Sequence, residues 1–423
     1  PDEFMLQVSA MTYESKTIAL SCCDSINLTL SPDPHDMDEV MVRVELRELQ
    51  GSMTQKTDYM KLDKLDVITP LSISSALTQI DGVQMASYGP LNSKPVIRGM
   101  QGMRVVTFLN GMRINNQQWG GDHGLGISQV GMESAEVIKG PMSLIYTGDA
   151  TGGLLYIKDG SFAPQNAYSI QMNTQFESVN KGSQNSLVYK VSGKKFRMSA
   201  AGIFSSYADY AYPDGGYLSD SRMQDYGGKF KLGYNSGKWN IELNYLYSNS
   251  RVGIPGHTHD SLATPTSFLV EDQDRGFSLP HQKIQNHFAN IKASYFMNSK
   301  NKMEFYLNHG YNNLKEFEEK IFTPGIDMYL NASSFQVRHH WNPNKNLQVL
   351  SGIQASAQSN NNGIKAEERL IDDSDQYDVG LYSSLSYDFG GLKFNTVIRL
   401  DQRAVRSSNF NNDYPNINAS IGI

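Results

Sequence analysis

Apolar and polar residues alternate with a period of two along much of the C-terminal part of the chain. In residues 239–247 the odd positions are apolar and most even positions are polar. Successive side chains of a β-strand point to opposite faces of its sheet, so this pattern predicts a strand with one apolar face. Similar segments recur from about residue 165 onward. Each has about ten residues, the length that a tilted strand needs to cross a bilayer.

Tight turns and long polar links alternate between these segments. The tight turns, each with Asn or Gly, lie at 235–238, 297–300, 342–345 and 390–391. The long links lie at about 207–224, 251–284, 314–327, 359–376 and 404–415. Outer-membrane β-barrels have this organisation, with short periplasmic turns and long extracellular loops. The pattern therefore predicts an antiparallel transmembrane β-barrel in a chain that is mainly β.

The number of strands is small for a closed barrel of this kind. Counted from Tyr168, the pattern predicts about twelve strands, against roughly 22 in plugged outer-membrane transporters. An open sheet would leave unpaired edges in lipid. The last residues, 416–423, also read as part of a strand. We therefore expect the chain to be a fragment that holds the N-terminal part of a barrel.

Residues 46–160 have a mixed pattern. Residues 71–77 predict a short amphipathic helix with Ser72 as its cap, which ends at a turn at 81–83. Apolar runs predict strands at 96–97, 105–109 and 135–138, and Asn110-Gly111 predicts a tight turn before a strand at 112–114. Short strands and helices in this order predict a small α+β domain before the barrel.

Composition narrows the possible functions. There is no run of about 18 apolar residues of the kind that forms a transmembrane helix, and the mean hydropathy is -0.44. Barrel strands dilute the hydrophobic signal, so these values agree with a barrel. The 23 Tyr and 18 Phe favour one, because aromatic residues form girdles at both membrane surfaces. The net charge of -6 argues against nucleic acid as a partner.

Four sequence strings in the mixed region carry a family resemblance. They are PVIRGMQGMRV at 95–105, FLNGMR at 108–113, EVIKGPMSLIY at 136–146 and ATGGLL at 150–155. In this order and spacing they closely resemble the plug of TonB-dependent outer-membrane receptors. The resemblance implies a plug domain at 46–160, the N-terminal part of a transmembrane β-barrel at 165–423, and a location in the bacterial outer membrane.

The N-terminal residues resemble an extension found on such receptors in Bacteroidetes-type bacteria. Residues 1–37 resemble the tail of its carboxypeptidase-regulatory-like β domain. Residues 38–45 resemble the TonB-box segment, whose matching residues are Asp38, Glu39, Val40, Met41 and Val42. This stretch lacks Pro and Gly and suits pairing with a partner as an added strand. A plain edge strand or linker is the alternative interpretation.

The resemblance implies active uptake. In the family the plug blocks the lumen, an external ligand binds above it, and TonB, driven by the inner-membrane proton gradient, pulls the plug from the periplasm. The implied partners are therefore TonB, outer-membrane lipid including lipopolysaccharide, and a small ligand such as a metal chelate. No cofactor is expected. Arg98 matches a plug arginine that faces barrel glutamates, a charged contact that we call the latch. Lys139 stands where many members have a second arginine, and this departure puts a second latch in doubt.

Two loops hold the candidate ligand-binding residues. Trp119, Asp122 and His123 belong to a Gly-rich loop of the plug, where the family's apical loops contact ligand. His257, His259 and Asp260 lie in the longest external link, and a His-x-His pair followed by Asp suits zinc or copper. His123, His257 and His259 are the candidate metal ligands. A turn with a capping Asp, and a polar surface loop, are the alternative interpretations.

Several functions compete. The leading interpretation is uptake of an iron–siderophore or another metal complex. Free zinc or copper, an oligosaccharide or a vitamin are alternatives within transport. A zinc hydrolase built on His257 and His259 is disfavoured, because no third ligand, catalytic Glu, nucleophile elbow or phosphate-binding loop follows at a recognised spacing. A passive porin is disfavoured by the plug-like region, so we expect no enzyme and no open pore.

Overall fold

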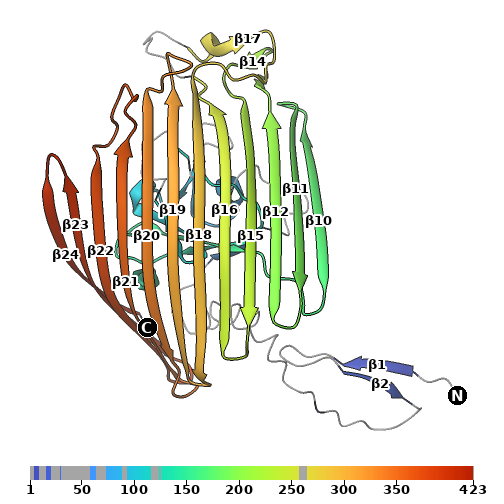
Figure 1. Cartoon of the computed structure of the whole chain (residues 1–423), viewed down its shortest axis with the longest axis vertical. Coiled ribbons are helices and arrows are strands. Elements are labelled where there is room, and N and C mark those ends of the chain that lie inside the picture. Colours follow the sequence, from blue (N-terminus) through green and yellow to red (C-terminus); the bar gives the residue numbers. More distant parts are fainter. Residues whose placement is uncertain are drawn as a thin grey trace.

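A computed structural model describes residues 4–8, 16–20, 29, 58–62, 73–87, 93–115, 123–124, 126–256 and 264–422. One antiparallel sheet of 12 strands dominates these residues, and each strand pairs with its neighbours in chain order (Figure 1). The strands are β10 (Tyr168–Glu177), β11 (Gly182–Ser192), β12 (Phe196–Tyr207), β15 (Met223–Asn235), β16 (Trp239–Gly253), β18 (His281–Asn298), β19 (Asn301–Phe317), β20 (Ile326–Trp341), β21 (Leu347–Asn362), β22 (Ser374–Asp388), β23 (Lys393–Ser407) and β24 (Asn411–Gly422). The sheet curves like a segment of a barrel wall, and we call it the wall.

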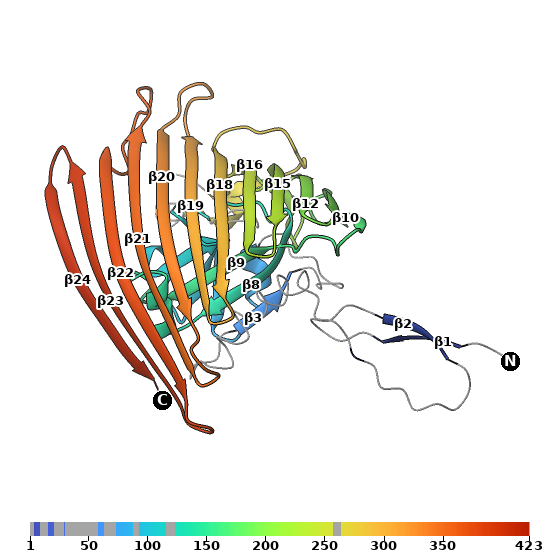
Figure 2. The same cartoon turned by 60° about the horizontal axis from the view of Figure 1, so that its bottom comes forward.

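The plug lies on the concave side of the wall (Figure 2). Its centre is a five-stranded sheet in the order β3 (Asp58–Lys61), β8 (Met132–Ile138), β9 (Gly153–Asp159), β6 (Val105–Leu109) and β7 (Met112–Ile114). Strands β6 and β9 are parallel, and the other pairs are antiparallel. A hairpin of β4 (Val83–Ser87) and β5 (Ser93–Ile97) follows the short helix α2 (Ile73–Leu77). The 3₁₀ turns η1 (Gly102–Arg104) and η3 (Pro141–Ile145) complete it. These elements confirm a small α+β domain followed by an antiparallel wall of twelve strands.

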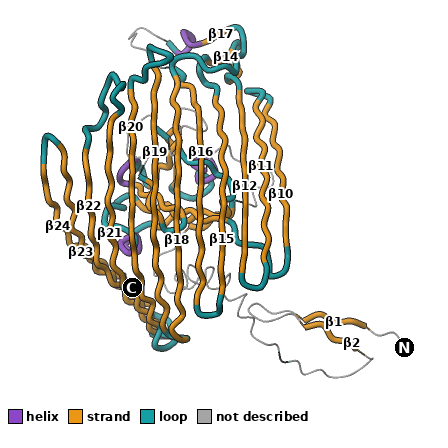
Figure 3. The backbone as a smooth tube through the Cα atoms, viewed as in Figure 1, coloured by secondary structure: helices purple, strands orange, loops and turns teal. Residues whose placement is uncertain are grey.

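Two small sheets stand outside the plug and the wall. Strands β1 (Phe4–Val8) and β2 (Lys16–Leu20) form an antiparallel pair near the N-terminus. Strands β13 (Tyr210–Ala211), β14 (Tyr217–Leu218) and β17 (Leu269–Val270), with the 3₁₀ turn η4 (Pro265–Phe268), cover the end of the wall that carries the long links (Figure 3). Among the described residues, no helix has the length and apolar character needed to cross a membrane.

The apolar core of the plug is continuous with the wall. One cluster joins plug residues such as Leu155 and Val137 to Phe288, Leu246 and Ile203 of the wall. A second joins Ile145 and Leu154 to wall residues Leu350, Tyr382 and Val397. Because each wall strand alternates its side chains between two faces, these contacts identify the inner face. Even positions point inward in β16 and β18–β22, and odd positions point inward in β12, β15 and β23.

The outer face carries two levels of aromatic side chains with aliphatic residues between them. The level near the short turns includes Trp239 and Tyr295, whose ring centroids lie 4.6 Å apart, and Phe196 and Tyr234 at 5.0 Å. The level near the long links includes Tyr247, His287, Tyr311 and Tyr329, with neighbouring rings 5.0 to 6.5 Å apart. Exposed residues between the levels include Leu243, Ile291 and Leu307. This is the pattern of an outer-membrane barrel that faces lipid.

The structure differs from the sequence prediction in the extent of the strands. The wall strands have 10 to 18 residues, more than the predicted ten in most cases, because they continue past the lipid-facing segment that shows clear alternation. The predicted long link at 404–415 is wrong. Residues 408–410 alone connect β23 and β24, and Arg406 pairs with Asn411 in the register. Among the strands of the plug, β3, β4 and β9 were not predicted from the sequence.

Candidate functional site

Uncharged amide side chains on the inner face of the wall bond to one another, beside inward-facing ion pairs such as Lys292–Glu304. Asn244 donates to Asn290 at 3.0 Å, Asn290 donates to Asn308, and Asn308 donates to Ser334 Oγ at 3.0 Å. These residues lie on neighbouring strands from β16 to β20. Amide groups that already satisfy each other do not require the plug to complete their bonds. The wall therefore offers the plug a polar surface that stays hydrogen-bonded without it.

Several of the direct hydrogen bonds between plug and wall involve amides. Asn286 Nδ2 on β18 donates to the carbonyl oxygen of Gly126 at 2.6 Å. Asn115 Nδ2, just after β7, donates to Gln358 Oε1 on β21 at 2.6 Å. The turn at Asn110-Gly111 also meets the wall, since a Cβ on Gly111 would lie 2.9 Å from the Tyr306 ring. Both turn residues have positive φ, 50° and 89°, as the predicted Asn-Gly turn requires.

An ion-pair cluster links the plug to β22 and β23. Asp149 of the plug accepts hydrogen bonds from Arg113 at 2.6 Å and from Arg403 on β23 at 2.7 Å. Arg403 also bonds to Asp378 on β22 at 2.5 Å. Burial alone would raise the pKa of Asp149, but the two guanidinium groups hold it well below its usual range. The carboxylate is therefore ionised at any physiological pH, and it joins plug and wall by charge-assisted bonds.

Three further cations of the wall bind the plug. Arg399 on β23 donates to the carbonyl oxygen of Leu144 at 3.2 Å. Lys229 on β15 is buried and pairs with Asp159 at the end of β9. Arg338 on β20 lies between the ring of Tyr146 in the plug, 5.0 Å from its centroid, and the ring of Tyr306 on β19, at 5.1 Å. A buried guanidinium between two aromatic faces gains a cation–π attraction on each side. Plug and wall thus meet through separate charged contacts as well as through neutral amides.

A separate cluster lies toward the end of the wall with the long links. His123 Nε2 is 3.4 Å from Glu316 Oε2 on β19, and Gln282 on β18 donates to the same carboxylate at 2.8 Å. All three side chains are buried. Beside them five inward-facing apolar residues form a buried cluster: Ile284, Leu314, Ile326, Met328 and Leu330. This is where the wall meets the predicted ligand-facing loop of the plug.

The structure places part of the predicted site. His123 joins the wall as described above. Trp119, Asp122, His257, His259 and Asp260 lie outside the described residues. Within the part of the chain that is described, no group of three or more His, Cys, Asp or Glu side chains could hold a metal ion.

The predicted latch residues have different surroundings. Arg98 is exposed in the turn after β5 and forms no ion pair with a described residue. Lys139 binds within the plug, to Asp58 Oδ2 and to the Asp81 carbonyl oxygen, each at 2.6 Å. Lys139 therefore connects β3 and the turn before β4 instead of reaching the wall. The TonB-box segment, from Asp38 to Val42, lies outside the described residues.

Apart from His123, the residues that bridge plug and wall were not singled out from the sequence. Asp149 and Arg403 are 254 residues apart, so nothing local connects them. A signal was nevertheless present in β23, where charged residues stand at 399, 401 and 403. Charges at a spacing of two share one face of a strand, and in a barrel that face is the lumen.

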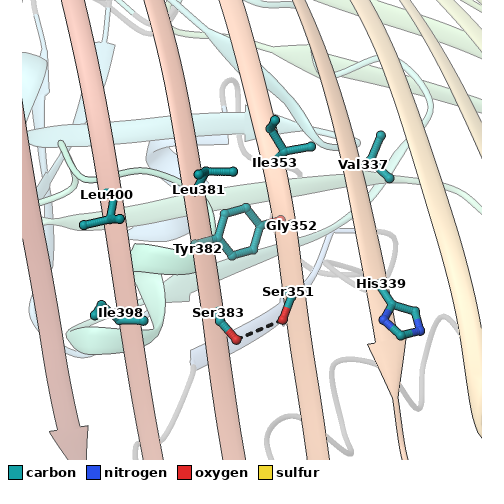
Figure 4. A pocket seen from close by; sticks show the side chains of 10 residues that line it. All are labelled: Val337, His339, Ser351, Gly352, Ile353, Leu381, Tyr382, Ser383, Ile398 and Leu400. Carbon is teal, nitrogen blue, oxygen red and sulfur yellow. Dashed lines mark hydrogen bonds between the residues drawn. The ribbon is translucent and has the colours of Figure 1, made fainter.

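A hollow of about 470 Å³ lies on the outer face of β20 to β23 (Figure 4). Ile353, Leu381, Ile398 and Leu400 line it, and the plug strands lie on the other side of the sheet. Its position among outward-facing aliphatic residues places it against lipid, away from the plug. It is therefore not the site where a ligand would rest on the plug.

Comparisons with known proteins agree with this architecture. Residues 49–154 match the sequence model of the TonB-dependent Receptor Plug Domain. The chain is 22% identical over 335 residues to the vitamin B12 transporter BtuB of Photobacterium profundum, which covers 78% of this chain and 51% of that protein. It is 30% identical over 98 residues to the same transporter of Vibrio vulnificus, covering 23% of this chain and 16% of that protein. The chain thus spans about half the length of the first of these relatives.

Solved structures show the same fold. The FrpB iron transporter of Neisseria meningitidis (F3-3 variant) superposes with a TM-score of 0.72 at 13% identity, over 87% of this chain and 62% of that one. The copper transporter OprC superposes with a TM-score of 0.70 at 13% identity, over 86% and 59%. The ferric citrate transporter FecA gives 0.69 at 11% identity, over 89% and 60%. At these identities the likeness concerns the fold alone.

Proposed function

The chain is a TonB-dependent outer-membrane receptor in its plug domain and its fold, and from this premise we propose that it serves active uptake of a scarce ligand across the outer membrane. The observation that carries the proposal is the plug on the concave face of the wall. A domain in that position obstructs the lumen, which a passive pore has no use for. Transport then requires the plug to move or rearrange, and no step of it requires catalysis.

The character of the plug–wall interface supports such movement. Neutral amides supply part of it, and the wall amides bond to one another without the plug. The charged contacts stand at separate positions, among them Asp149, Asp159 and Arg338. Each of these contacts resists displacement of the plug. Breaking one of them costs the free energy of a single contact, and that free energy is regained when the contact re-forms. An interface of this kind holds the plug at rest and yields to a directed pull.

We assign energy coupling to the segment Asp38, Glu39, Val40, Met41 and Val42. Its support is its position before a recognised plug and its acidic-to-apolar sequence without Pro or Gly. TonB in the periplasm would bind it as an added strand. Arg98, exposed and next to a positive-φ glycine, keeps its proposed role as a latch toward the barrel. Ligand contact by Trp119, Asp122, His257, His259 and Asp260 is likewise proposed from the sequence.

The cargo that we propose is a metal complex, such as an iron–siderophore. The FrpB iron and FecA ferric citrate transporters share the fold. A vitamin is the second candidate, because the vitamin B12 transporter BtuB matches most of the chain in sequence. Free copper is the third, since the copper transporter OprC shares the fold and two predicted loops carry histidine. An oligosaccharide remains an alternative from the family resemblance.

Uptake by cells that carry the complete receptor as their sole outer-membrane route tests this proposal. Labelled ferric siderophore, vitamin B12 and copper are each supplied with and without a functional TonB. We expect TonB-dependent accumulation of one metal complex, at least tenfold above a strain without the receptor. Accumulation that is equal without TonB would contradict active transport and indicate a pore. TonB-dependent uptake of an oligosaccharide in place of all three would contradict the cargo and leave the mechanism intact.

A further inference from the structure

Basic side chains gather on the inner face of the wall, in the half that is nearer the short turns. They occupy inward positions of β11, β12, β15, β18, β19 and β20, as the register of these strands shows. We call these seven residues the basic inner patch: Lys190, Arg197, Lys229, Lys231, Lys292, Lys302 and Arg338. The acidic residues at inward positions of the same region are Glu242 on β16 and Glu304 on β19. Among the described residues of this region, the wall therefore has an excess of five positive charges.

The sign of the charge changes along the same strands toward the long links. There the inward charged residues among those described are Asp225 on β15 and Glu316 on β19. Asp225 accepts a hydrogen bond from Ser250 at 2.7 Å, and Glu316 accepts one from Gln282 at 2.8 Å. A negative charge inside the wall is therefore more stable near the short turns than near the long links, because opposite charges attract and like charges repel.

The wall neutralises the basic inner patch only in part. Lys231 pairs with Glu242 at 3.3 Å. Lys292 and Lys302 share the carboxylate of Glu304, at 3.2 and 3.3 Å. Two carboxylates thus serve three lysines of the patch, and the remaining positive charge is not matched by acidic residues of the wall in this region.

Aromatic rings hold several members of the patch without neutralising them. Phe162, in the connection between β9 and β10, contacts both Arg197 and Lys231, whose cationic groups lie 4.7 and 4.3 Å from its ring centroid. Gly233 leaves room for this ring, since a Cβ on it would lie 2.8 Å from the ring. Arg338 is held by two rings, as described above. An aromatic ring attracts a cation but carries no net charge, so these contacts leave the positive charge of the patch in place.

An acidic plug is the alternative explanation for the patch, and it accounts for only part of the charge. Asp159 of the plug pairs with Lys229. Glu136 of the plug, in contrast, pairs with Lys158 of the plug itself at 3.3 Å. A surface that served only to hold the plug would match its cations with plug carboxylates, as Lys229 is matched. The excess charge therefore points to a further anion, which meets the wall when the plug is displaced.

We propose that the cargo is an anionic metal complex, which the basic inner patch attracts toward the periplasm once the plug has moved. With the plug in place, Lys229, Lys231 and Arg338 are buried. A cleft lined by one sign of charge concentrates ions of the opposite sign, and rings of Arg and Lys select anions in pores. Free copper is a cation, so the patch would repel it. The inference rests on the proposed active uptake and names the charge class of its cargo.

Uptake by cells that carry the complete receptor as their sole outer-membrane route tests the inference, with and without TonB. The labelled probes are ferric citrate and a ferric tris-catecholate, which are anionic, and a ferric tris-hydroxamate, which is neutral. The variant Lys190→Gln/Arg197→Gln/Lys302→Gln lowers the excess charge from five to two and leaves the Lys231–Glu242 and Lys292–Glu304 pairs intact.

The maximal rate at which this variant takes up an anionic complex should fall at least about fivefold relative to its rate for the neutral complex. Binding of the anionic complex from outside should change less than about twofold, because the plug then covers the patch. The ratio of the two rates does not depend on the amount of receptor in the membrane. A variant that only folded less well would therefore leave the ratio unchanged.

A matched control replaces Lys238, Lys300 and Lys345, which are exposed in the short turns, by Gln. It removes the same net charge away from the inner face and should keep the wild-type ratio of the rates. An unchanged ratio in the patch variant would overturn the inference. So would a wild type that takes up neither anionic complex. Uptake that does not depend on TonB would instead contradict active transport, and the ratio of the rates would still report the charge preference.

Discussion

At the scale of single residues, Asp149 forms one of the ionic contacts between plug and wall. It lies directly after the 136–146 string, in a stretch whose apolar residues are buried in the second cluster of the core. The charges of Arg113 and Arg403 depress the pKa of its carboxyl group, although burial alone would raise it. A depressed pKa in the folded state stabilises that state above the unfolded value of about 3.9. This contribution is lost only as the pH falls through the lower folded value.

We therefore predict that this contact is insensitive to pH between about 8 and 4. Hydrogen exchange of the 140–150 segment in the complete receptor should show the same protection by this contact across that range. The variant Asp149→Asn should lose about 1–3 kcal/mol of local protection at every pH in it, because two charge-assisted bonds are weakened. Asp378→Asn is the matched control, since it removes a wall carboxylate and leaves Asp149 with both arginines. A protection that declined steadily between pH 7 and 5 would contradict the assignment.

At the scale of elements, the local pattern predicted the wall well. The predicted turns at 235–238, 342–345 and 390–391 separate β15 from β16, β20 from β21 and β22 from β23. Alternation is strong there, because one face meets lipid and the other meets the polar lumen. It fails beyond the membrane, where both faces are polar. Residues 404–415 illustrate this failure. Arg406 and Asp413 form an ion pair on the outer face of β23 and β24, and a strand with such residues resembles a loop in sequence.

The site was less predictable than the strands. The Asn110-Gly111 turn was foreseen because its geometry is local, and the motifs located the plug. The partners of the plug were not foreseen, because Asp149–Arg403 and His123–Glu316 join residues that only the curvature of the wall brings together. The family resemblance compared Lys139 with an arginine that contacts the barrel. In the structure the nearby Asp58 and the Asp81 carbonyl bind Lys139 inside the plug. Sequence motifs therefore identify the family of a domain more readily than the tertiary contacts of its residues.

Deletion of residues 38–42 from the complete receptor tests the element that we assign to TonB. Uptake should fall to the level of a strain without TonB, because no strand remains for TonB to pair with. The affinity for the ligand should change less than twofold, since the segment precedes the plug and is far in sequence from the proposed ligand loops. Deletion of the upstream residues 31–34 serves as the control and should preserve uptake. Persistent uptake after the first deletion would show that TonB binds elsewhere.

At the scale of the whole molecule, the plug and the wall form one continuous structure at rest. Their apolar clusters are shared, and cations of the wall hold carboxylates of the plug. The outer face has a separate organisation, with two levels of aromatic side chains and aliphatic residues between them. We propose that the plug must leave its position against the wall for a ligand to pass.

A reversible cross-link between plug and wall tests that claim most directly. Ser128 of the plug and Gly227 on β15 are suitable, because a Cβ on Gly227 would lie 3.4 Å from the Ser128 Cβ, near the separation in a disulfide of about 3.5–4.5 Å. The variant Ser128→Cys/Gly227→Cys is made in the complete receptor with Cys22 and Cys23 replaced by Ser. The single variant Gly227→Cys controls for strain, since the new Cβ would lie 3.0 Å from the Tyr247 carbonyl oxygen.

Uptake of the cargo is measured in oxidised cells and again after reduction. A second cross-link, Ser351→Cys/Ser383→Cys, joins two wall strands on the outer face at a pair whose hydroxyl oxygens lie 2.9 Å apart (Figure 4). We predict that oxidation of the 128–227 pair abolishes uptake, keeps ligand affinity within twofold, and is reversed by reduction, while the 351–383 pair transports normally throughout. Full uptake through the oxidised 128–227 receptor would contradict the account, because the ligand would then pass with the plug fixed to the wall.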